Sequence, residues 1–380
     1  MPWEAEGPCE DAAVRILHVV AQSQRRGAEI AALDLALELD ARGHEDLLLA
    51  LGPAFDGATD PALPVLAGAG RGPMAAVGSA RALRRFVRQE RPDLVVVHGG
   101  WPAQVAALGL GRLGVAVVWQ RILDFPLALW KPTRRRWWRW VAGRASGVVA
   151  LTDTMVDEMA RLGYPGAVRV IPNSRRPERF ATVNRAAASA RLRAELGLGS
   201  NVTLLGLVGH VVAQKRPDRA VDVVAAVRSA GGAVHLVVAG TGPLRADVER
   251  QVADLGLHDA VSFLGHRDDI EQVLGAVDLL LLTSDAEGIP GILIEAQMAG
   301  CPVVTVPVGG VAEVVEDGVT GAVLASFAVS EMADRVLALV GSPELLVRMG
   351  LEARLRSERF STVVVAARYE SFFEELLVRR

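Results

Sequence analysis

Cysteine is scarce in this sequence of 380 residues, which contains only Cys9 and Cys301. Two thiols so far apart in the chain provide neither a disulfide framework nor the closely spaced ligands of a structural metal site. This cysteine usage is typical of a protein in a reducing compartment.

An excess of charge of one sign is also missing. The 41 basic residues are balanced by 44 acidic residues, which gives a formal net charge of −3. A balanced chain has no global positive field to hold nucleic acid. We therefore expect no nucleic-acid partner.

Long apolar runs are absent as well. No run approaches the 18 or more apolar residues that a membrane-spanning helix requires. Residues 1–11 are acidic and lack the basic region and apolar region of a secretory signal. These features predict a cytoplasmic protein.

The composition that remains is ordinary globular material, with 51% hydrophobic and 22% charged residues. A chain of 380 residues exceeds the usual size of one hydrophobic core. Two domains of about 150 to 200 residues are therefore expected.

The first half alternates short apolar runs with helical patterns. Runs such as 94–97 are nearly all apolar and β-branched, which is the composition of a strand buried on both faces. The alternation predicts an α/β domain with a parallel sheet. We predict strands at 14–20, 47–51, 94–97, 115–119, 147–151 and 168–171, and helices ending at Gly43 and spanning 76–90.

The second half repeats this alternation after a polar stretch rich in Ala and Arg, at roughly 181–200. It predicts a second Rossmann-like unit, followed by a helical region at 328–356 and an amphipathic segment at 362–378. The predicted strands are 202–208, 233–239, 278–282 and 302–306, and the predicted helices begin at Pro217 and span 243–256 and 292–299.

Polar residues follow several of these strands. His98 follows strand 94–97, His210 and Lys215 follow strand 202–208, and Glu287 follows strand 278–282. In doubly wound sheets, ligands bind at the carboxyl ends of strands, where loops and helix N-termini present backbone N–H groups. These residues are therefore candidates for a binding site.

The segment 287–304 carries the densest signal. A helix N-terminus with Gly291 allowing close approach is suited to a diphosphate, and Glu295 lies where a carboxylate can accept hydrogen bonds from ribose hydroxyls. Lys215 adds a cation. Taken alone, Glu295 is more simply a carboxylate near a helix start that the helix dipole favours.

Taken in order, these segments resemble retaining glycosyltransferases of the GT-B fold, in the group 1, family 4-like class with a Glu-x7-Glu motif. Residues 287–304 resemble that motif, and residues 205–220 resemble the family's Gly-Arg-Leu-x3-Lys loop. Further matching segments are 26–45, 93–100, 168–174, 240–244 and 309–321.

The resemblance implies an α/β fold of two Rossmann-like domains whose parallel sheets face each other across a cleft. It implies an acceptor domain at 1–176 and a nucleotide-sugar donor domain at 177–360. The segment 361–380 would be a C-terminal helix that crosses back to the first domain.

The resemblance also implies an enzyme that transfers a sugar from a nucleotide-diphosphate sugar to an acceptor hydroxyl. By residue, it implies catalytic roles for His98, Lys215 and Glu287. The implied donor-binding residues are Gly27, His210, Lys215, Glu287, Gly291, Ile292, Leu293 and Glu295, and residues on the acceptor side or without a firm assignment are Arg26, Gly310 and Glu313. The acceptor would be a cell-envelope or exopolysaccharide glycan, a lipid-linked sugar or a small metabolite.

No metal and no other cofactor are expected, because backbone amides and a lysine can stabilise a departing nucleotide diphosphate. The pair Asp268 and Asp269 superficially suggests a metal site. It lies where a helix should begin, and we interpret it as N-terminal capping.

Three positions depart from the family pattern. His210 stands where the family has a diphosphate-binding Arg, Arg26 stands where it has a Gly, and Ser174 replaces the Gly after Ile-Pro-Asn. Loss of a charge-assisted contact costs about 1.5–3 kcal/mol. The alternatives are therefore a catalytically silent nucleotide-sugar-binding protein, or another activity on this fold, such as a sugar-nucleotide epimerase or a phosphorylase.

The segment 130–140, WKPTRRRWWRW, places four Trp beside five basic residues. This composition suits peripheral contact with the inner face of an anionic membrane. A simpler interpretation is a helix that packs its Trp residues on the first domain and leaves its basic residues in solvent. Recognition of the acceptor is a third interpretation.

Overall fold

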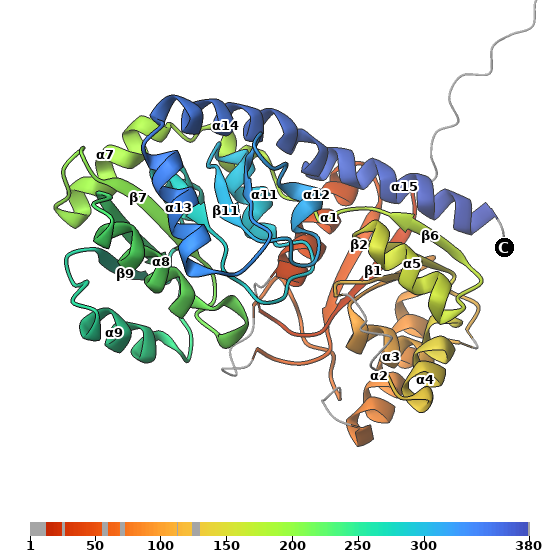
Figure 1. Ribbon diagram of the computed structural model, residues 1–380. Coiled ribbons are helices and arrows are strands. Elements are labelled where there is room, and N and C mark those ends of the chain that lie inside the picture. Colours follow the sequence, from red (N-terminus) through yellow and green to blue (C-terminus); the bar gives the residue numbers. More distant parts are fainter. Residues whose placement is uncertain are drawn as a thin grey trace, which may run out of the picture. The chain divides into compact units, whose positions relative to one another are not determined.

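The computed structural model describes residues 13–24, 27–54, 60–68, 73–111, 113–123 and 130–378, which divide into two compact units. Unit 1 comprises Met1–Ile171 and Ala366–Arg380, and unit 2 comprises Pro172–Val365. The sequence-based boundaries at 176/177 and 360/361 lie five residues from these divisions. Each unit is a layered α/β structure with its own parallel sheet (Figure 1).

Unit 1 has a six-stranded parallel sheet in the order β2-β1-β3-β4-β5-β6. Every residue of β3 and β4 is buried, as the apolar runs 94–97 and 115–119 predict. The elements are β1 (Arg15–Val20), α1 (Gly27–Ala41), β2 (Glu45–Ala50), α2 (Pro73–Glu90), β3 (Leu94–His98), α3 (Gly100–Gly109), β4 (Ala116–Gln120), α4 (Pro132–Ala142), β5 (Gly147–Ala150), α5 (Asp153–Leu162) and β6 (Ala167–Val170).

Unit 2 has a second six-stranded parallel sheet, in the order β12-β11-β10-β7-β8-β9. Its strands are β7 (Thr203–Val208), β8 (Val234–Ala239), β9 (Val261–Gly265), β10 (Leu279–Leu281), β11 (Val303–Thr305) and β12 (Gly321–Val323). Its helices are α6 (Glu178–Ala181), α7 (Arg185–Leu196), the 3-10 turn η2 (Ala213–Lys215), α8 (Pro217–Ser229), α9 (Arg245–Asp254), α10 (Ile270–Ala276), α11 (Gly291–Met298), α12 (Val311–Val314), α13 (Val329–Val340), α14 (Pro343–Arg356) and η3 (Ser357–Phe360).

The last helix, α15 (Thr362–Val378), belongs to unit 1 from Ala366 onward, as the sequence predicts for a helix that crosses back. Its aromatic face packs on the sheet of unit 1: a Cβ built on Gly147 of β5 would lie 2.6 Å from the Phe372 ring. Arg42 reinforces the attachment through an ion pair with Glu370 at 2.6 Å.

The polar stretch at 181–200 is not a plain connection. It contains α7, which begins after Asn184, whose side chain accepts a hydrogen bond from the Ala187 backbone N–H at 3.1 Å. The helix ends at Gly197, which has a positive φ of 68°. The buried Ala188 and Leu192 give α7 only a narrow apolar face, so its helical period is hard to see in the sequence.

Candidate functional site

The predicted site residues Lys215 and Glu287 meet at the carboxyl edge of the sheet in unit 2. Strands β7 and β10 pair in parallel, so the turn after β7 and the loop after β10 emerge side by side. Lys215 Nζ lies 2.5 Å from Glu287 Oε1. The Glu287 side chain is 8% exposed and that of Lys215 is 27% exposed, so the carboxylate is the more enclosed partner.

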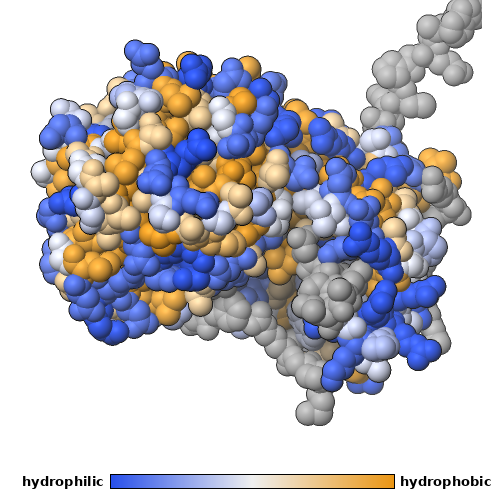
Figure 2. Space-filling model, viewed as in Figure 1, coloured by the Kyte–Doolittle hydropathy of each residue, from blue (hydrophilic) through white to orange (hydrophobic). Residues whose placement is uncertain are grey.

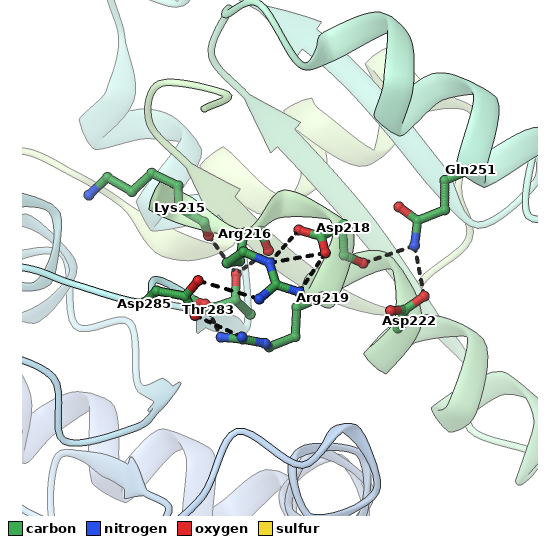
Figure 3. A network of polar contacts seen from close by, with 8 residues as sticks. All are labelled: Lys215, Arg216, Asp218, Arg219, Asp222, Gln251, Thr283 and Asp285. Atoms are coloured by element: carbon green, nitrogen blue, oxygen red, sulfur yellow. Dashed lines mark hydrogen bonds and ion pairs between the residues drawn. The ribbon is translucent and has the colours of Figure 1, made fainter. Parts of the chain in front are cut away.

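A set of hydrogen bonds ties the two segments together. The Thr283 hydroxyl donates a hydrogen bond to the Arg216 carbonyl oxygen at 2.9 Å. It also lies 3.0 Å from the Lys215 carbonyl oxygen. The Asp285 N–H donates to the Gln214 carbonyl at 2.9 Å, and the Gln214 amide donates to the Ala286 carbonyl at 2.6 Å. In Figure 3 the Lys215 side chain extends away from this network, whose bonds hold its backbone.

Two arginines that sequence reasoning missed complete this network (Figure 3). The buried Arg219 donates to the Thr283 carbonyl at 2.6 Å and to Asp285 at 2.8 Å. The hydrogen bond from Arg219 to Asp285, and then the one from Arg216, lower the pKa of Asp285. Arg216 adopts a positive φ of 47° and binds Asp218, and the hydrogen bond from Arg216 lowers the Asp218 pKa. The turn that carries Lys215 is thus fixed by charged side chains on both sides.

The Glu287 loop also rests on Gly309 and Gly310, which follow β11 in the sequence. A Cβ on Gly309 would lie 1.9 Å from the Glu287 carbonyl oxygen, so only glycine fits there, and its φ is 52°. The Gly310 N–H donates to the Gly288 carbonyl at 2.7 Å. Glu313 is an exposed residue of α12, and its carbonyl accepts from Arg359 at 2.8 Å. Gly310 therefore supports the Glu287 loop, whereas Glu313 lies on the surface of the unit.

Helix α11 carries four of the predicted donor-binding residues. Gly291 is its first residue, and Ile292 follows it, half-buried. Leu293 is a core residue whose N–H donates to the Pro290 carbonyl at 3.0 Å, and its predicted donor contact stays a prediction. Glu295 is half-buried and lies in the second turn of the helix.

Glu295 has a partner that the sequence did not indicate. Arg175 Nε lies 2.5 Å from Glu295 Oε1, although 120 residues separate them. The neighbouring Asn173 side chain donates to the Ile289 carbonyl at 3.2 Å. The Ile-Pro-Asn-Ser turn is therefore bound to the loop and helix that carry Glu287 and Glu295.

A small hollow lies beside Lys215 at the ends of β7 and β10. His210, Lys215 and Ser284 bring polar groups to it, and Leu207, Val238 and Leu282 are among its apolar lining residues. His210 is exposed. Ser284 is fully buried, and its hydroxyl has no hydrogen-bond partner in the part of the chain that the structure describes.

In unit 1, the predicted catalytic residue His98 is buried within a polar chain that crosses four neighbouring strands. His98 Nε2 lies 3.0 Å from His18 Nδ1, and His18 Nε2 lies 2.7 Å from Asp46. His98 Nδ1 contacts Gln120 Oε1 on the other side. Because both ring nitrogens of His98 are engaged, its direct contact with a sugar stays a prediction.

Lowering the pH is expected to destabilise unit 1 through His98. Burial, and then the neighbouring His18, lowers the pKa of His98 to about 3, so the folded side chain is neutral at pH 5. The unfolded chain binds a proton at this residue below about pH 6.5. The contribution of the neutral His98 to the stability of unit 1 is therefore fully present above that pH. It is lost progressively as the pH falls toward 3.

The variant His98→Gln removes this titration. The slope of its unfolding free energy against pH should therefore be smaller than that of wild type by up to ~1.4 kcal/mol per pH unit, which corresponds to one proton. Urea unfolding of wild type and variant at pH 7, 6 and 5 measures the difference. Identical pH dependence in the two proteins contradicts the prediction. If the variant does not fold, ¹⁵N NMR of the His98 ring in wild type provides the test instead. Protonation of this ring between pH 7 and pH 5 contradicts the prediction.

Two of the predicted site residues, Arg26 and Gly27, are adjacent in the sequence. Arg26 lies outside the described residues. Gly27 is the exposed first residue of helix α1, and a Cβ built on it would come within 4 Å of none of the described residues. Among these residues, nothing requires glycine at position 27 for steric reasons.

Asp268 and Asp269 precede α10, as predicted, but their carboxylates do not cap it. Asp269 instead forms two hydrogen bonds with Arg267, at 2.7 and 2.9 Å, and the exposed Asp268 pairs with His266 at 3.2 Å. The Asp269 carboxylate therefore binds the guanidinium of Arg267 instead of a backbone N–H at the start of α10. Within the described ranges, no group of three or more His, Cys, Asp or Glu side chains is arranged to hold a metal ion.

Two sequence-family models match the chain. The family described as "Glycosyl transferases group 1" matches residues 189–356, and the family described as "Glycosyltransferase Family 4" matches residues 25–179. The first match contains the Lys215 turn, the Glu287 loop and α11. The second contains most of unit 1.

Curated proteins with related sequences include glycosyltransferases. The alpha-D-kanosaminyltransferase of Streptomyces kanamyceticus is 30% identical over 263 residues, covering 68% of this chain and 66% of that protein. The D-inositol 3-phosphate glycosyltransferase of Nocardia farcinica is 33% identical over 233 residues, covering 56% of this chain and 51% of that protein. The matches span about half to two thirds of these relatives' own length.

Among solved structures, Anabaena Alr3699/HepE in complex with UDP and glucose superposes with a TM-score of 0.81. It is 21% identical, and the match covers 95% of this chain and 100% of that one. This likeness establishes the fold, which is GT-B, with two Rossmann-like units. Since one family model covers most of each unit and the fold agrees over nearly the whole chain, the protein belongs to the group 1 glycosyltransferases.

Proposed function

We propose that the protein is a retaining glycosyltransferase that moves a sugar from a nucleoside-diphosphate sugar to an acceptor hydroxyl without a divalent metal. The observation that carries this proposal is the ion pair of Lys215 with Glu287 beside the N-terminus of α11. One cation and the first turn of a helix can bind the donor diphosphate, and Glu287 can bind hydroxyls of the donor sugar.

In the proposed reaction, the bond between the sugar C1 and the diphosphate oxygen breaks, and C1 forms a bond with the acceptor oxygen on the same face. The acceptor proton passes to the departing phosphate oxygen, so no protein nucleophile is needed. Lys215 stabilises the negative charge that develops on the diphosphate. Glu287 positions the sugar and contributes electrostatically, and His98 remains the predicted contact with the sugar from unit 1.

Thermal-shift titration with UDP, GDP, ADP, dTDP and CMP, each with EDTA or with Mg²⁺, tests the donor site. We expect one nucleoside diphosphate to stabilise the protein equally in both conditions. The relative from Anabaena was crystallised with UDP and with UDP-glucose, so UDP is the first candidate. No stabilisation at millimolar concentration contradicts a nucleotide-sugar donor, and stabilisation only with Mg²⁺ contradicts metal independence.

Turnover with the matching nucleotide sugar then separates the remaining activities. Transfer needs an acceptor and should give a glycoside that retains the donor's anomeric configuration, which NMR can assign. An epimerase changes the sugar nucleotide without an acceptor. Binding without any turnover in a broad acceptor screen indicates a silent sugar-nucleotide-binding protein.

We also propose that α4 binds the anionic inner face of a membrane. Trp130 and Trp138 pack in the core of unit 1, but Trp137 is 38% exposed beside the exposed Lys131 and arginines of the same helix. No Asp or Glu occurs in residues 130–152. Figure 2 shows hydrophilic side chains gathered over the part of unit 1 where Figure 1 labels α4. In the described part of the chain, no helix combines the length and apolarity needed to span a bilayer.

Co-sedimentation with vesicles of phosphatidylcholine, alone or with phosphatidylglycerol, tests this surface. Binding should require the anionic lipid and weaken at high salt. The double variant Arg135→Glu/Arg136→Glu should bind at least about 30-fold more weakly, because each basic residue contributes about 1 kcal/mol. The control variant Arg245→Glu/Arg250→Glu changes the net charge by the same amount, but its substitutions lie on α9. Equal binding by the two variants contradicts the proposal.

A further inference from the structure

Arg175 directly follows the Ile-Pro-Asn-Ser turn, and its backbone is held on both sides. Its N–H donates to the Phe360 carbonyl at 3.0 Å, and its carbonyl accepts from the Thr362 N–H at 3.2 Å. The side chain is only 5% exposed. A long, charged side chain in such a position is costly to bury, so its partners determine what it does.

The guanidinium group occupies the space that a side chain at position 291 would take. A Cβ built on Gly291 would lie 1.7 Å from Arg175 Nη2. Arg175 Nη1 donates to the Ser174 carbonyl at 2.8 Å, and Nε donates to Glu295 at 2.5 Å. The lack of a side chain at Gly291 therefore allows an arginine to lie against the first turn of α11.

The contact fixes the carboxylate of Glu295. Only Oε1 takes part in a hydrogen bond or ion pair with the described residues, and the side chain remains 16% exposed. A buried guanidinium at this distance restricts the rotation of the carboxylate. The second oxygen, Oε2, is left to accept a hydrogen bond from a ligand.

We infer that Arg175 is a positioning residue of the nucleotide site, which orients Glu295 so that Oε2 accepts from a ribose hydroxyl. This inference rests on the proposed nucleotide-sugar donor. Arg175 acts on the ribose through Glu295, so its removal should change discrimination between ribose and deoxyribose more than overall phosphate binding. A direct contact of Arg175 with the diphosphate would give the opposite pattern.

Calorimetric titration of UDP, GDP or ADP, whichever binds wild type most tightly, and of its 2′-deoxy and 3′-deoxy forms, tests the inference. A site that hydrogen-bonds a hydroxyl strongly rejects an analogue that lacks it. Wild type should therefore favour the ribonucleotide over one deoxy form by roughly 10-fold or more. In Arg175→Met, the ratio of the affinity for the ribonucleotide to the affinity for that deoxy form should fall below about threefold, as it should in Glu295→Gln. Arg175→Lys should restore part of this ratio.

Gly291→Ala provides a second route to the same result, because the added Cβ must displace the guanidinium while the arginine is kept. Arg185→Met is the matched control in unit 2. Arg185 donates to the Leu274, Val277 and Ala299 carbonyls, so its loss should lower the melting temperature and leave the ribose ratio unchanged.

An unchanged ratio in both Arg175→Met and Gly291→Ala overturns the inference. This includes the case in which both variants bind ribo and deoxy forms equally more weakly, which assigns Arg175 to the diphosphate. Failure of the proposed function looks different, because wild type itself then binds none of the nucleotides and the inference is rejected with it.

Discussion

Replacing Lys215 by methionine is expected to weaken the binding of the preferred nucleoside diphosphate by roughly 100-fold. A charge-assisted hydrogen bond contributes about 1.5–3 kcal/mol, which corresponds to roughly 10-fold to 150-fold in affinity. The variant also leaves Glu287, whose side chain is 8% exposed, without its cation. A carboxylate in that position then repels the diphosphate, so the total loss should lie near the upper end of this range.

Calorimetric titration of wild type and Lys215→Met measures this loss. Lys131→Met is the matched control, since Lys131 is the only other lysine in the sequence and is exposed on the surface just before α4. The double variant Lys215→Met/Glu287→Gln should regain thermal stability relative to Lys215→Met, because the uncompensated charge is gone, but should remain inactive. Binding by Lys215→Met within threefold of wild type contradicts the assignment of the site.

Replacing Glu158 by alanine is expected to cost unit 1 about 3–5 kcal/mol of unfolding free energy. The partner Arg121 has a fully buried side chain, whose Nη2 lies 2.5 Å from Glu158 Oε2. Arg121 also donates a hydrogen bond to the Met155 carbonyl at 2.8 Å, and removing one partner of a buried ion pair is strongly destabilising. The melting temperature should therefore fall by roughly 6–20 °C.

Differential scanning calorimetry checks this prediction, with Glu45→Ala as the control in the same unit. Glu45 pairs with Arg15 at 2.9 Å, but its side chain is largely exposed, so its loss should cost less than about 1 kcal/mol. The double variant Arg121→Met/Glu158→Leu should recover most of the stability, because an apolar pair can replace a buried ion pair. Equal effects of Glu158→Ala and Glu45→Ala contradict this interpretation.

The strands at the centre of each sheet were predictable because they are buried on both faces. β3 and β4 are apolar up to their last residues, His98 and Gln120, and a parallel sheet covered by helices requires such apolar runs. The edge strands β9 and β12 were missed. β9 is mostly half-buried and mixed in polarity, and β12 has only three residues, so neither gives a clear pattern.

Several site residues were predictable from their position after strands. Lys215 and Glu287 follow β7 and β10, and the pairing of these strands places them at the same edge. The pairing partners of other residues were not predictable. Arg175 and Glu295 are 120 residues apart, and nothing in either local sequence indicates that Gly291 leaves room for a guanidinium between them.

The alternation of strands and helices follows from local sequence, because it depends on periodicity. The same holds for the polar residues that come directly after strands. Three further features appear only once the chain is folded: His98 is enclosed by His18 and Gln120, Leu293 faces the core, and Arg175 binds Glu295. Such contacts depend on side-chain packing between segments distant in the chain, where burial leaves each charged or polar group only a few partners.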